Sequence, residues 1–183
     1  MENFWILISS STVISAIVSC IASHLLNIYT QNLAYRNDYY KNIINKRFET
    51  YQHIDNIICA LKSTMVDNDG KGCHSMFTND SKEYYKVILC LHNALTNSMW
   101  LTDEMFNVLK NLNQAFLDIS YSITDDKAAN IKIGKENYSK LGKLRTEIEN
   151  QFKTDLLDMS NVSRFMKKKT KLKTLNYEIP APK

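Results

Sequence analysis

The sequence predicts an all-α protein in which one N-terminal transmembrane helix continues into a bundle of four or five helices. Three observations support this fold class. Only 4 glycines and 2 prolines occur among 183 residues, and both prolines lie in the last four positions. A long uncharged stretch begins near the N-terminus, and apolar residues recur at helical spacing through most of the remaining chain. A sheet protein with many tight turns normally contains more glycine and proline, so long helices with few loops are favoured.

The N-terminal stretch has the length and composition of a membrane span. No Asp, Glu, Lys or Arg occurs in residues 3–35, and the most apolar part, residues 4–26, contains 23 residues. That length crosses a bilayer core of roughly 30 Å as a helix. A cleaved signal peptide is disfavoured because Glu2 is the only charged side chain before the span and no Ala-x-Ala site follows it. We therefore expect a transmembrane helix over residues 1–29.

Basic residues follow the span and set its expected direction. Only the amino terminus and one acidic side chain precede it. The basic residues that come after it are Arg36, Lys41, Lys46 and Arg47. Because single-pass proteins keep their Lys- and Arg-rich flank in the cytoplasm, we expect the C-terminal domain there and the N-terminus outside.

Polar side chains recur every four residues along the predicted span. This series, the polar stripe, consists of Ser11, Ser15, Ser19, Ser23, Asn27 and Gln31. Small residues at this spacing let helix backbones approach closely, and their hydroxyl groups can bond across the contact, which favours self-association. The alternative is that each hydroxyl bonds a carbonyl of its own helix, four residues earlier. A ring of such helices would leave the stripe facing either a neighbour or a central opening.

Residues 30–175 are predicted to form the bundle, with residues 176–183 as a flexible tail. The first helix should continue to about Met65, because apolar residues there alternate steps of three and four. A glycine-containing loop is expected over residues 67–80. The remaining helices are expected over residues 81–97, from Thr102 to Ser122, after the segment 122–134 as a long helix that includes Tyr138 to Leu156, and from Val162 to Leu172.

A basic run lies near the end of the chain. It comprises Arg164, Lys167, Lys168, Lys169, Lys171 and Lys173. Most such runs are solvated, and that is the first interpretation. Contact with anionic membrane lipid is the second, and direct binding of RNA phosphates is the third.

Motifs for metal, cofactor and hydrolytic chemistry are missing from the sequence. The 4 cysteines form no Cys-x-x-Cys pair. The chain has no glycine-rich phosphate loop, no His-Glu-x-x-His and no Gly-x-Ser-x-Gly. We therefore predict neither a metal nor a cofactor.

The segment RFETYQH, from Arg47 to His53, has the Arg-x(4–6)-His spacing of a ribonuclease family. A histidine can transfer a proton during metal-free RNA cleavage, and an arginine can stabilise charge on the phosphate. Six residues along an ideal helix, however, place the two side chains about 120° apart. Arg47 also falls within the series of apolar residues that alternates steps of three and four along the first helix. A guanidinium buried there needs an acid such as Glu83, Asp103 or Glu104. A structural arginine is therefore the alternative interpretation.

With its single N-terminal span, its helical body and this motif, the chain resembles the membrane accessory protein of type VI-B CRISPR systems. The resemblance covers nearly the whole chain in length and layout. It implies a cytoplasmic bundle of divergent HEPN type and a homo-oligomeric ring in the bacterial inner membrane whose helices form a pore. That pore would enhance antiviral defence by permeabilising or depolarising the membrane once the RNA-guided ribonuclease of the system is active.

The chain differs from active HEPN ribonucleases in two respects. The residue after the arginine is usually polar in that family and is Phe48 here, and the motif lies in the first helix after the span instead of late in the bundle. We therefore interpret Arg47 and His53 as a degenerate, non-catalytic motif and expect the protein not to be an enzyme. A membrane-tethered HEPN ribonuclease and a membrane-anchored adaptor are the alternatives.

Overall fold

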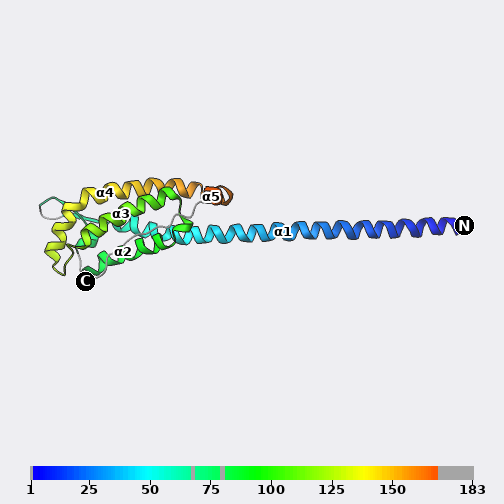
Figure 1. The fold of residues 1–183 in the computed structure, drawn as a ribbon, viewed down its shortest axis with the longest axis horizontal. Coiled ribbons are helices and arrows are strands. Elements are labelled where there is room, and N and C mark those ends of the chain that lie inside the picture. Colours follow the sequence, from blue (N-terminus) through cyan, green and yellow to red (C-terminus); the bar gives the residue numbers. More distant parts are fainter. Residues whose placement is uncertain (1, 67–68, 79–80, 169–183) are drawn as a thin grey trace. The chain divides into compact units, whose positions relative to one another are not determined.

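The computed structural model describes residues 2–66, 69–78 and 81–168, and these residues are mostly helical (Figure 1). The elements, in chain order, are α1 (Glu2–Lys62), β1 (Thr64–Val66), β2 (Gly72–His74), the 3-10 turn η1 (Ser75–Phe77), α2 (Ser81–Thr96), the 3-10 turn η2 (Ser98–Trp100), α3 (Asp103–Ser120), α4 (Lys127–Leu157) and α5 (Val162–Lys168). The mostly helical class with one long apolar N-terminal helix is confirmed. The tail predicted over residues 176–183 lies outside the described residues.

The chain divides into two compact units, residues 1–42 and residues 43–183. The first unit is the N-terminal part of α1, and every side chain from Val13 to Tyr39 is exposed in the structure. The uninterrupted helix follows from the sequence, since neither glycine nor proline occurs between Glu2 and Lys62.

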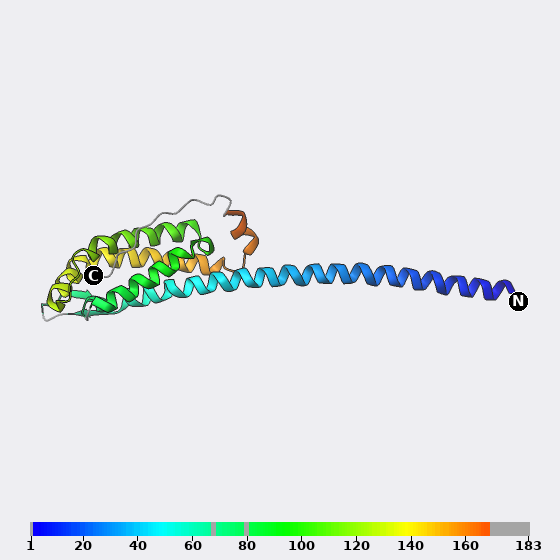
Figure 2. The same ribbon diagram turned by 60° about the horizontal axis from the view of Figure 1, so that its bottom comes forward.

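The second unit is a helical bundle that buries the C-terminal part of α1. Contacts join α2 to α3 and α3 to α4, and these helices run side by side in two views (Figures 1 and 2). From α1 the core receives Tyr51, Ile54, Ile57, Ile58 and Leu61. The other helices contribute residues that include Tyr84, Leu91, Leu95, Met105, Leu109, Phe116, Leu141 and Ile148. Burial of such side chains contributes about 1.5–3 kcal/mol each, and it is the main source of stability in this unit.

Side-chain caps fix the starts of α3 and α4. Thr102, the predicted N-cap, accepts a hydrogen bond at its Oγ1 from the backbone N–H of Met105 at 3.2 Å. Asp126 accepts one at Oδ1 from the N–H of Ala128 at 3.0 Å. Both bonds satisfy backbone donors that have no partner inside the helix, so the local sequence determines where each helix begins.

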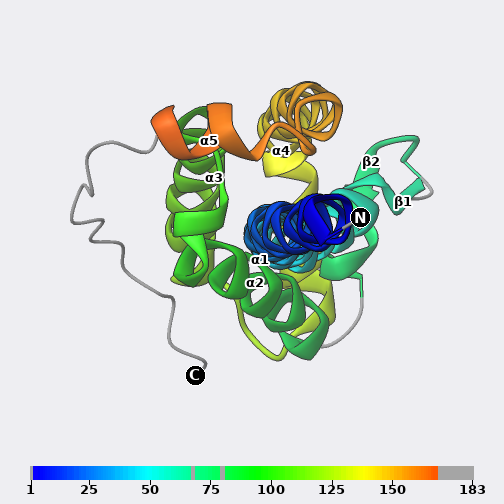
Figure 3. The same cartoon turned by 90° about the vertical axis from the view of Figure 1, so that its right-hand side faces the viewer.

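A short antiparallel hairpin replaces the end of the first helix, which was predicted to reach about Met65 but ends at Lys62, and part of the loop predicted over residues 67–80. Strand β1 pairs with β2 so that Thr64 faces His74 and Met65 faces Cys73. Strand β2 packs against α4, and the hairpin and α3 lie on opposite sides of the bundle when it is viewed end-on (Figure 3). Three-residue strands have too few positions to show an alternating pattern, which is why periodicity did not predict them.

Glycine permits the close approach of this hairpin to α4. A Cβ atom on Gly134 would lie 2.5 Å from the Sγ atom of Cys73 and 2.8 Å from the Cβ atom of Phe77. No larger residue fits there without displacing the hairpin. The cost of a glycine inside a helix, about 1 kcal/mol relative to alanine, is offset here by packing.

Candidate functional site

Five polar side chains meet inside the bundle and form what we call the Arg47–Asp155 cluster. Arg47 and Tyr51 are four residues apart on α1 and therefore share one face of that helix. Gln151 and Asp155 have the same spacing on α4. The fifth member, Thr102, is the N-cap of α3. Three helices thus bring these five side chains together, two from α1, two from α4 and one from the N-cap of α3.

Asp155 is the acceptor at the centre of the cluster, and it is only 3% exposed. Its Oδ2 atom accepts hydrogen bonds from the Tyr51 hydroxyl at 2.5 Å and from the Thr102 hydroxyl at 2.8 Å. Its Oδ1 atom accepts from the amide Nε2 of Gln151 at 2.8 Å. A buried carboxylate is costly unless hydrogen bonds replace its water, and these three bonds do so.

Arg47 is 1% exposed and joins α1 to the segment that follows α4. Its Nη1 atom donates to the carbonyl oxygen of Met159 at 2.9 Å. Its Cζ atom lies 4.1 Å from the centroid of the Phe165 ring, a cation–π distance. Its Nε atom has no hydrogen-bond partner among the described residues. These contacts hold α5 against α1 and are those of a structural arginine.

The cluster changes the ionisation of Tyr51. Burial raises the pKa of the Tyr51 hydroxyl far above its usual value, and the negative charge of Asp155 and the hydrogen bond to it act in the same direction. Contacts with Thr102 and the charge of Arg47 oppose this rise only in part. Tyr51 therefore stays protonated and acts as a hydrogen-bond donor throughout the physiological range.

A cavity of about 740 Å³ lies beside the cluster. It is lined by Arg47, Thr102, Asp103, Glu104, Gln151, Thr154, Asp155, Leu157, Asp158, Arg164, Phe165 and Lys168. Three of these side chains are basic and four are acidic. Because the charges are mixed, the lining does not select strongly for either an anion or a cation.

The structure does not bring Arg47 and His53 to a common site. His53 is half-buried on α1 and is not among the residues that line the cavity beside Arg47. Of the acids considered as partners for Arg47, Asp103 and Glu104 line this cavity, but the hydrogen bond of Arg47 goes to a backbone carbonyl. The carboxylate of the cluster is that of Asp155.

Sequence reasoning missed Asp155, although the sequence contains a signal for it. Leu141, Ile148 and Asp155 are spaced by seven residues on α4, and the first two are fully buried. An acid that continues an apolar heptad position faces the same core. Such an acid must find donors inside the protein, and Tyr51 provides the shortest hydrogen bond.

The exposed part of α1, residues 13–39, is the second candidate site. The polar stripe is fully exposed from Ser15 to Gln31, and the side chain of Ser11 lies outside the described part. Its two last members contact each other, since the Nε2 atom of Gln31 donates to Oδ1 of Asn27 at 3.3 Å. Thr30, beside the stripe, donates to the carbonyl of Leu26 at 3.0 Å, as expected for a hydroxyl that bonds its own helix.

A second series on the same segment, the exposed seam, alternates steps of four and three. It consists of Ile14, Val18, Ile21, Leu25, Ile28, Asn32, Tyr35 and Tyr39, all exposed. This spacing is that of the a and d positions of a coiled coil, and Asn32 occupies an a position. In parallel coiled coils a single asparagine at a fixes the register between helices. Ile28 is 43% exposed. Where such an apolar series does not lie in the lipid core, it marks a surface that another protein segment contacts.

The basic run is only partly described. Arg164, Lys167 and Lys168 lie on α5 and are exposed. Arg164 makes an ion pair with Asp158 at 3.6 Å, and Lys168 borders the cavity of the Arg47–Asp155 cluster. The other members, Lys169, Lys171 and Lys173, lie outside the described residues.

These features define a mostly helical protein with one candidate membrane-spanning helix in the described part of the chain. An 18-residue window of α1 has a mean hydropathy of 1.6, and none of it is buried in the structure. No protein-family model, no curated protein and no solved structure matches the chain. Within residues 2–66, 69–78 and 81–168, no three His, Cys, Asp or Glu side chains are grouped as metal ligands would be.

Proposed function

We propose that the protein is a single-pass protein of the bacterial inner membrane whose copies associate through residues 13–39 of α1 and form a pore. The observation that carries the proposal is this segment, where an exposed polar stripe and an exposed seam run along one uninterrupted helix. Polar groups that face lipid need partners, and a neighbouring copy with the same stripe supplies them. One helix cannot enclose an aqueous path, so the proposal requires a ring.

The orientation and biological role complete the proposal. The basic residues after the span favour a cytoplasmic location for the bundle, which we take to be HEPN-like. The resemblance to the type VI-B accessory protein suggests that the pore enhances antiviral defence by depolarising the membrane when an RNA-guided ribonuclease is active. Coupling to that ribonuclease is functional in this proposal, and direct RNA binding is not required.

The first test is the mass of the full-length protein in detergent, corrected for bound detergent. A large discrete oligomer is expected. The double substitution Ser15→Leu and Ser19→Leu should reduce both that mass and the loss of membrane potential in cells. The matched control, Val13→Leu with Ile17→Leu, leaves the stripe intact and should change neither. A monomer or dimer, or normal depolarisation by the serine variant, would refute the pore.

The contacts of Arg47 weigh against the alternative of a membrane-tethered ribonuclease. A catalytic arginine must reach the phosphate, whereas this one is 1% exposed, bonded to Met159 and stacked on Phe165. The purified full-length protein is expected to leave single-stranded RNA intact. Cleavage that disappears in both Arg47→Lys and His53→Gln, with unfolding unchanged in each, would establish the ribonuclease instead.

A further inference from the structure

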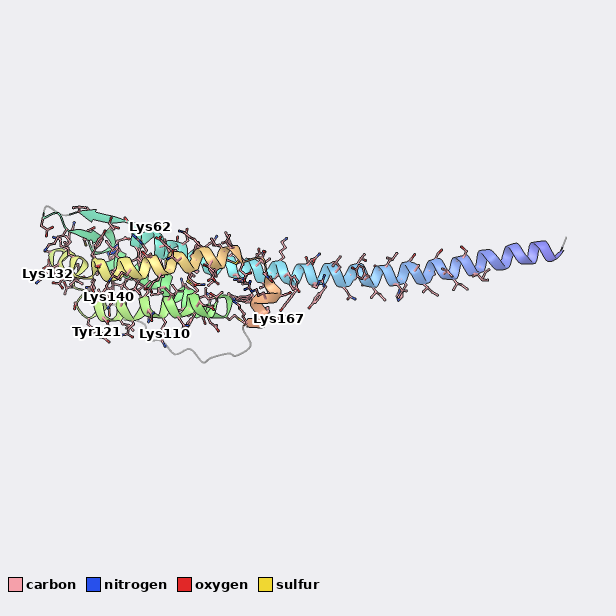
Figure 4. The ribbon with its side chains drawn as sticks, turned by 90° about the horizontal axis from the view of Figure 1, so that it is seen from above. Lys62, Lys110, Tyr121, Lys132, Lys140 and Lys167 are labelled. Carbon is pink, nitrogen blue, oxygen red and sulfur yellow. The ribbon has the colours of Figure 1, made fainter. Side chains whose placement is uncertain are left out.

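A surface hollow that is open to solvent, with a volume of about 500 Å³, lies along α4 beside the hairpin and shares no lining residue with the cavity of the Arg47–Asp155 cluster. It is lined by His74, Tyr138, Ser139, Gly142, Lys143, Arg145, Thr146 and Glu147. Figure 4 labels Lys132 and Lys140 on α4, the helix that supplies Tyr138, Ser139 and Gly142 to the lining of this hollow. Its volume falls within the range of small-molecule sites.

The two glycines of α4 differ in whether packing within the chain explains their presence, and the one that packing does not explain lines the hollow. Gly134 is required because a side chain there would collide with Cys73 and Phe77 of the hairpin and η1. Gly142, eight residues later, would place a Cβ atom in open space, with nothing within 4 Å. A glycine in the middle of a helix lowers its stability relative to alanine, and contacts within the chain give Gly142 no compensation. Gly142 therefore leaves the backbone of α4 uncovered at one point of the lining.

Residues of the hairpin and Tyr138 pack together at one side of the hollow. The ring of Tyr138 lies against the backbone of Gly72, where an added Cβ atom would be 2.9 Å from Cζ. The same ring stacks on His74, with 4.9 Å between the ring centroids. The Tyr138 ring is thus packed on two residues of the hairpin, and packing that orders a ring in advance reduces the entropy cost of binding.

His74 is a buried polar group without a normal hydrogen bond. It is 1% exposed, and neither ring nitrogen has a hydrogen-bond partner of normal geometry among the described residues. Burial lowers the pKa of His74 below its usual value, although the nearby backbone carbonyls of Tyr138 and Leu61 favour the charged ring. A buried imidazole without a hydrogen-bond partner of normal geometry is uncommon in folded proteins.

The charges around the hollow favour an anion. Arg145 contacts Glu149 at 3.4 Å, and Glu149 also pairs with Lys62 at 3.3 Å. The carboxylate of Glu149 is therefore shared between two cations. Lys143 has no ion pair or hydrogen bond within the described part of the chain. Glu147 is the one acid in the lining, against Lys143 and Arg145. The net charge of the lining is therefore positive, and the hydroxyl groups of Ser139 and Thr146 add polar contacts.

We propose that this hollow binds the phosphoryl group of a small molecule. Lys143 and Arg145 face its charge, and the bare backbone at Gly142 allows it to approach α4 closely. Tyr138 lines the hollow and is 37% exposed, so its ring can stack on a planar base, and a mononucleotide is the fitting class. The inference is independent of the proposed pore, because it uses only residues of the bundle and needs no second copy.

The test measures equilibrium binding of inorganic phosphate and of adenosine monophosphate to the full-length protein in a neutral detergent. Saturable binding is expected for both, and it should be tighter for the nucleotide if its base stacks on Tyr138. Gly142→Leu fills the hollow and Lys143→Gln removes its unpaired cation, and each should weaken binding at least about tenfold. Lys153→Gln, a matched change at an exposed lysine of α4 outside the hollow, should leave binding as it is.

Stability measurements make the result decisive. Leucine is a better helix former than glycine, so Gly142→Leu should unfold at the same or a higher temperature than the wild type. Lost binding together with retained stability would support the site. The proposal fails if neither probe binds saturably, if Gly142→Leu binds as the wild type does, or if Lys153→Gln weakens binding as much as Lys143→Gln. None of these outcomes depends on whether the protein forms an oligomer.

Discussion

The two parts of α1 share one backbone conformation and have opposite surroundings. From Val13 to Tyr39 every side chain is exposed, whereas Tyr51, Ile54, Ile57 and Leu61 are almost completely buried. Hydrogen bonds within the helix are the same in both parts, so they do not account for the difference. Tertiary packing stabilises the second part, whereas in the proposed pore lipid and neighbouring copies stabilise the first. Helicity alone therefore says little about what a segment contacts.

The largest expected effect on the free energy of unfolding is the difference between the same substitution made in the buried part and in the exposed part of α1. Ile54→Ala removes a fully buried side chain and should lower the free energy of unfolding of the bundle by about 3 kcal/mol. Ile21→Ala, the same change at an exposed position, should alter it by less than about 0.5 kcal/mol. Urea unfolding of the full-length protein in detergent measures both values. Equal losses would mean that the two parts are stabilised in the same way.

A smaller effect separates the structural and catalytic interpretations of Arg47. Arg47→Met keeps much of the side-chain volume and removes the bond to Met159 and the cation–π contact with Phe165. We expect a loss of about 2 kcal/mol in the same unfolding measurement. His53→Gln, on another face of α1, should cost less than about 0.5 kcal/mol. If Arg47→Met unfolded like the wild type, the contacts of Arg47 would not be structural.

The third prediction concerns pH. The pKa of His74 in the folded state lies below its unfolded value of 6.5, chiefly because of burial. Between these two values the unfolded chain binds a proton that the folded chain does not, so stability is retained above pH 6.5 and falls as the pH drops below it. A single proton gives a slope of at most about 1.4 kcal/mol per pH unit. His74→Gln should flatten the profile, measured by urea unfolding between about pH 7 and pH 5. An unchanged profile would contradict the assignment.

The smallest effect is expected at the surface, where α1 passes into the bundle. Lys46 and Glu49 form an ion pair at 2.8 Å, with more than half of each side chain exposed. Glu49→Gln should change the free energy of unfolding by only about 0.3–0.5 kcal/mol, and less in high salt. A loss comparable to that of Ile54→Ala would show that burial does not dominate in this part of α1.

Sequence reasoning predicted those elements that depend on local chemistry. The uninterrupted α1, the helix over residues 81–97 and the start of α3 at Thr102 follow from composition, periodicity and capping. The hairpin and the burial of Asp155 depend on contacts between distant parts of the chain. Gly134, for example, is required only because Cys73 packs against it, and the sequence does not reveal that contact.

The candidate site divides in the same way. The sequence by itself identified Arg47 as a residue on an apolar seam and showed that a buried guanidinium would need partners. Only the tertiary structure decided that these partners are Met159 and Phe165, and that the acid of the cluster is Asp155. The physical reason is that helix formation and capping are determined within a few residues, whereas the partner of a buried charge is determined by which helices pack together.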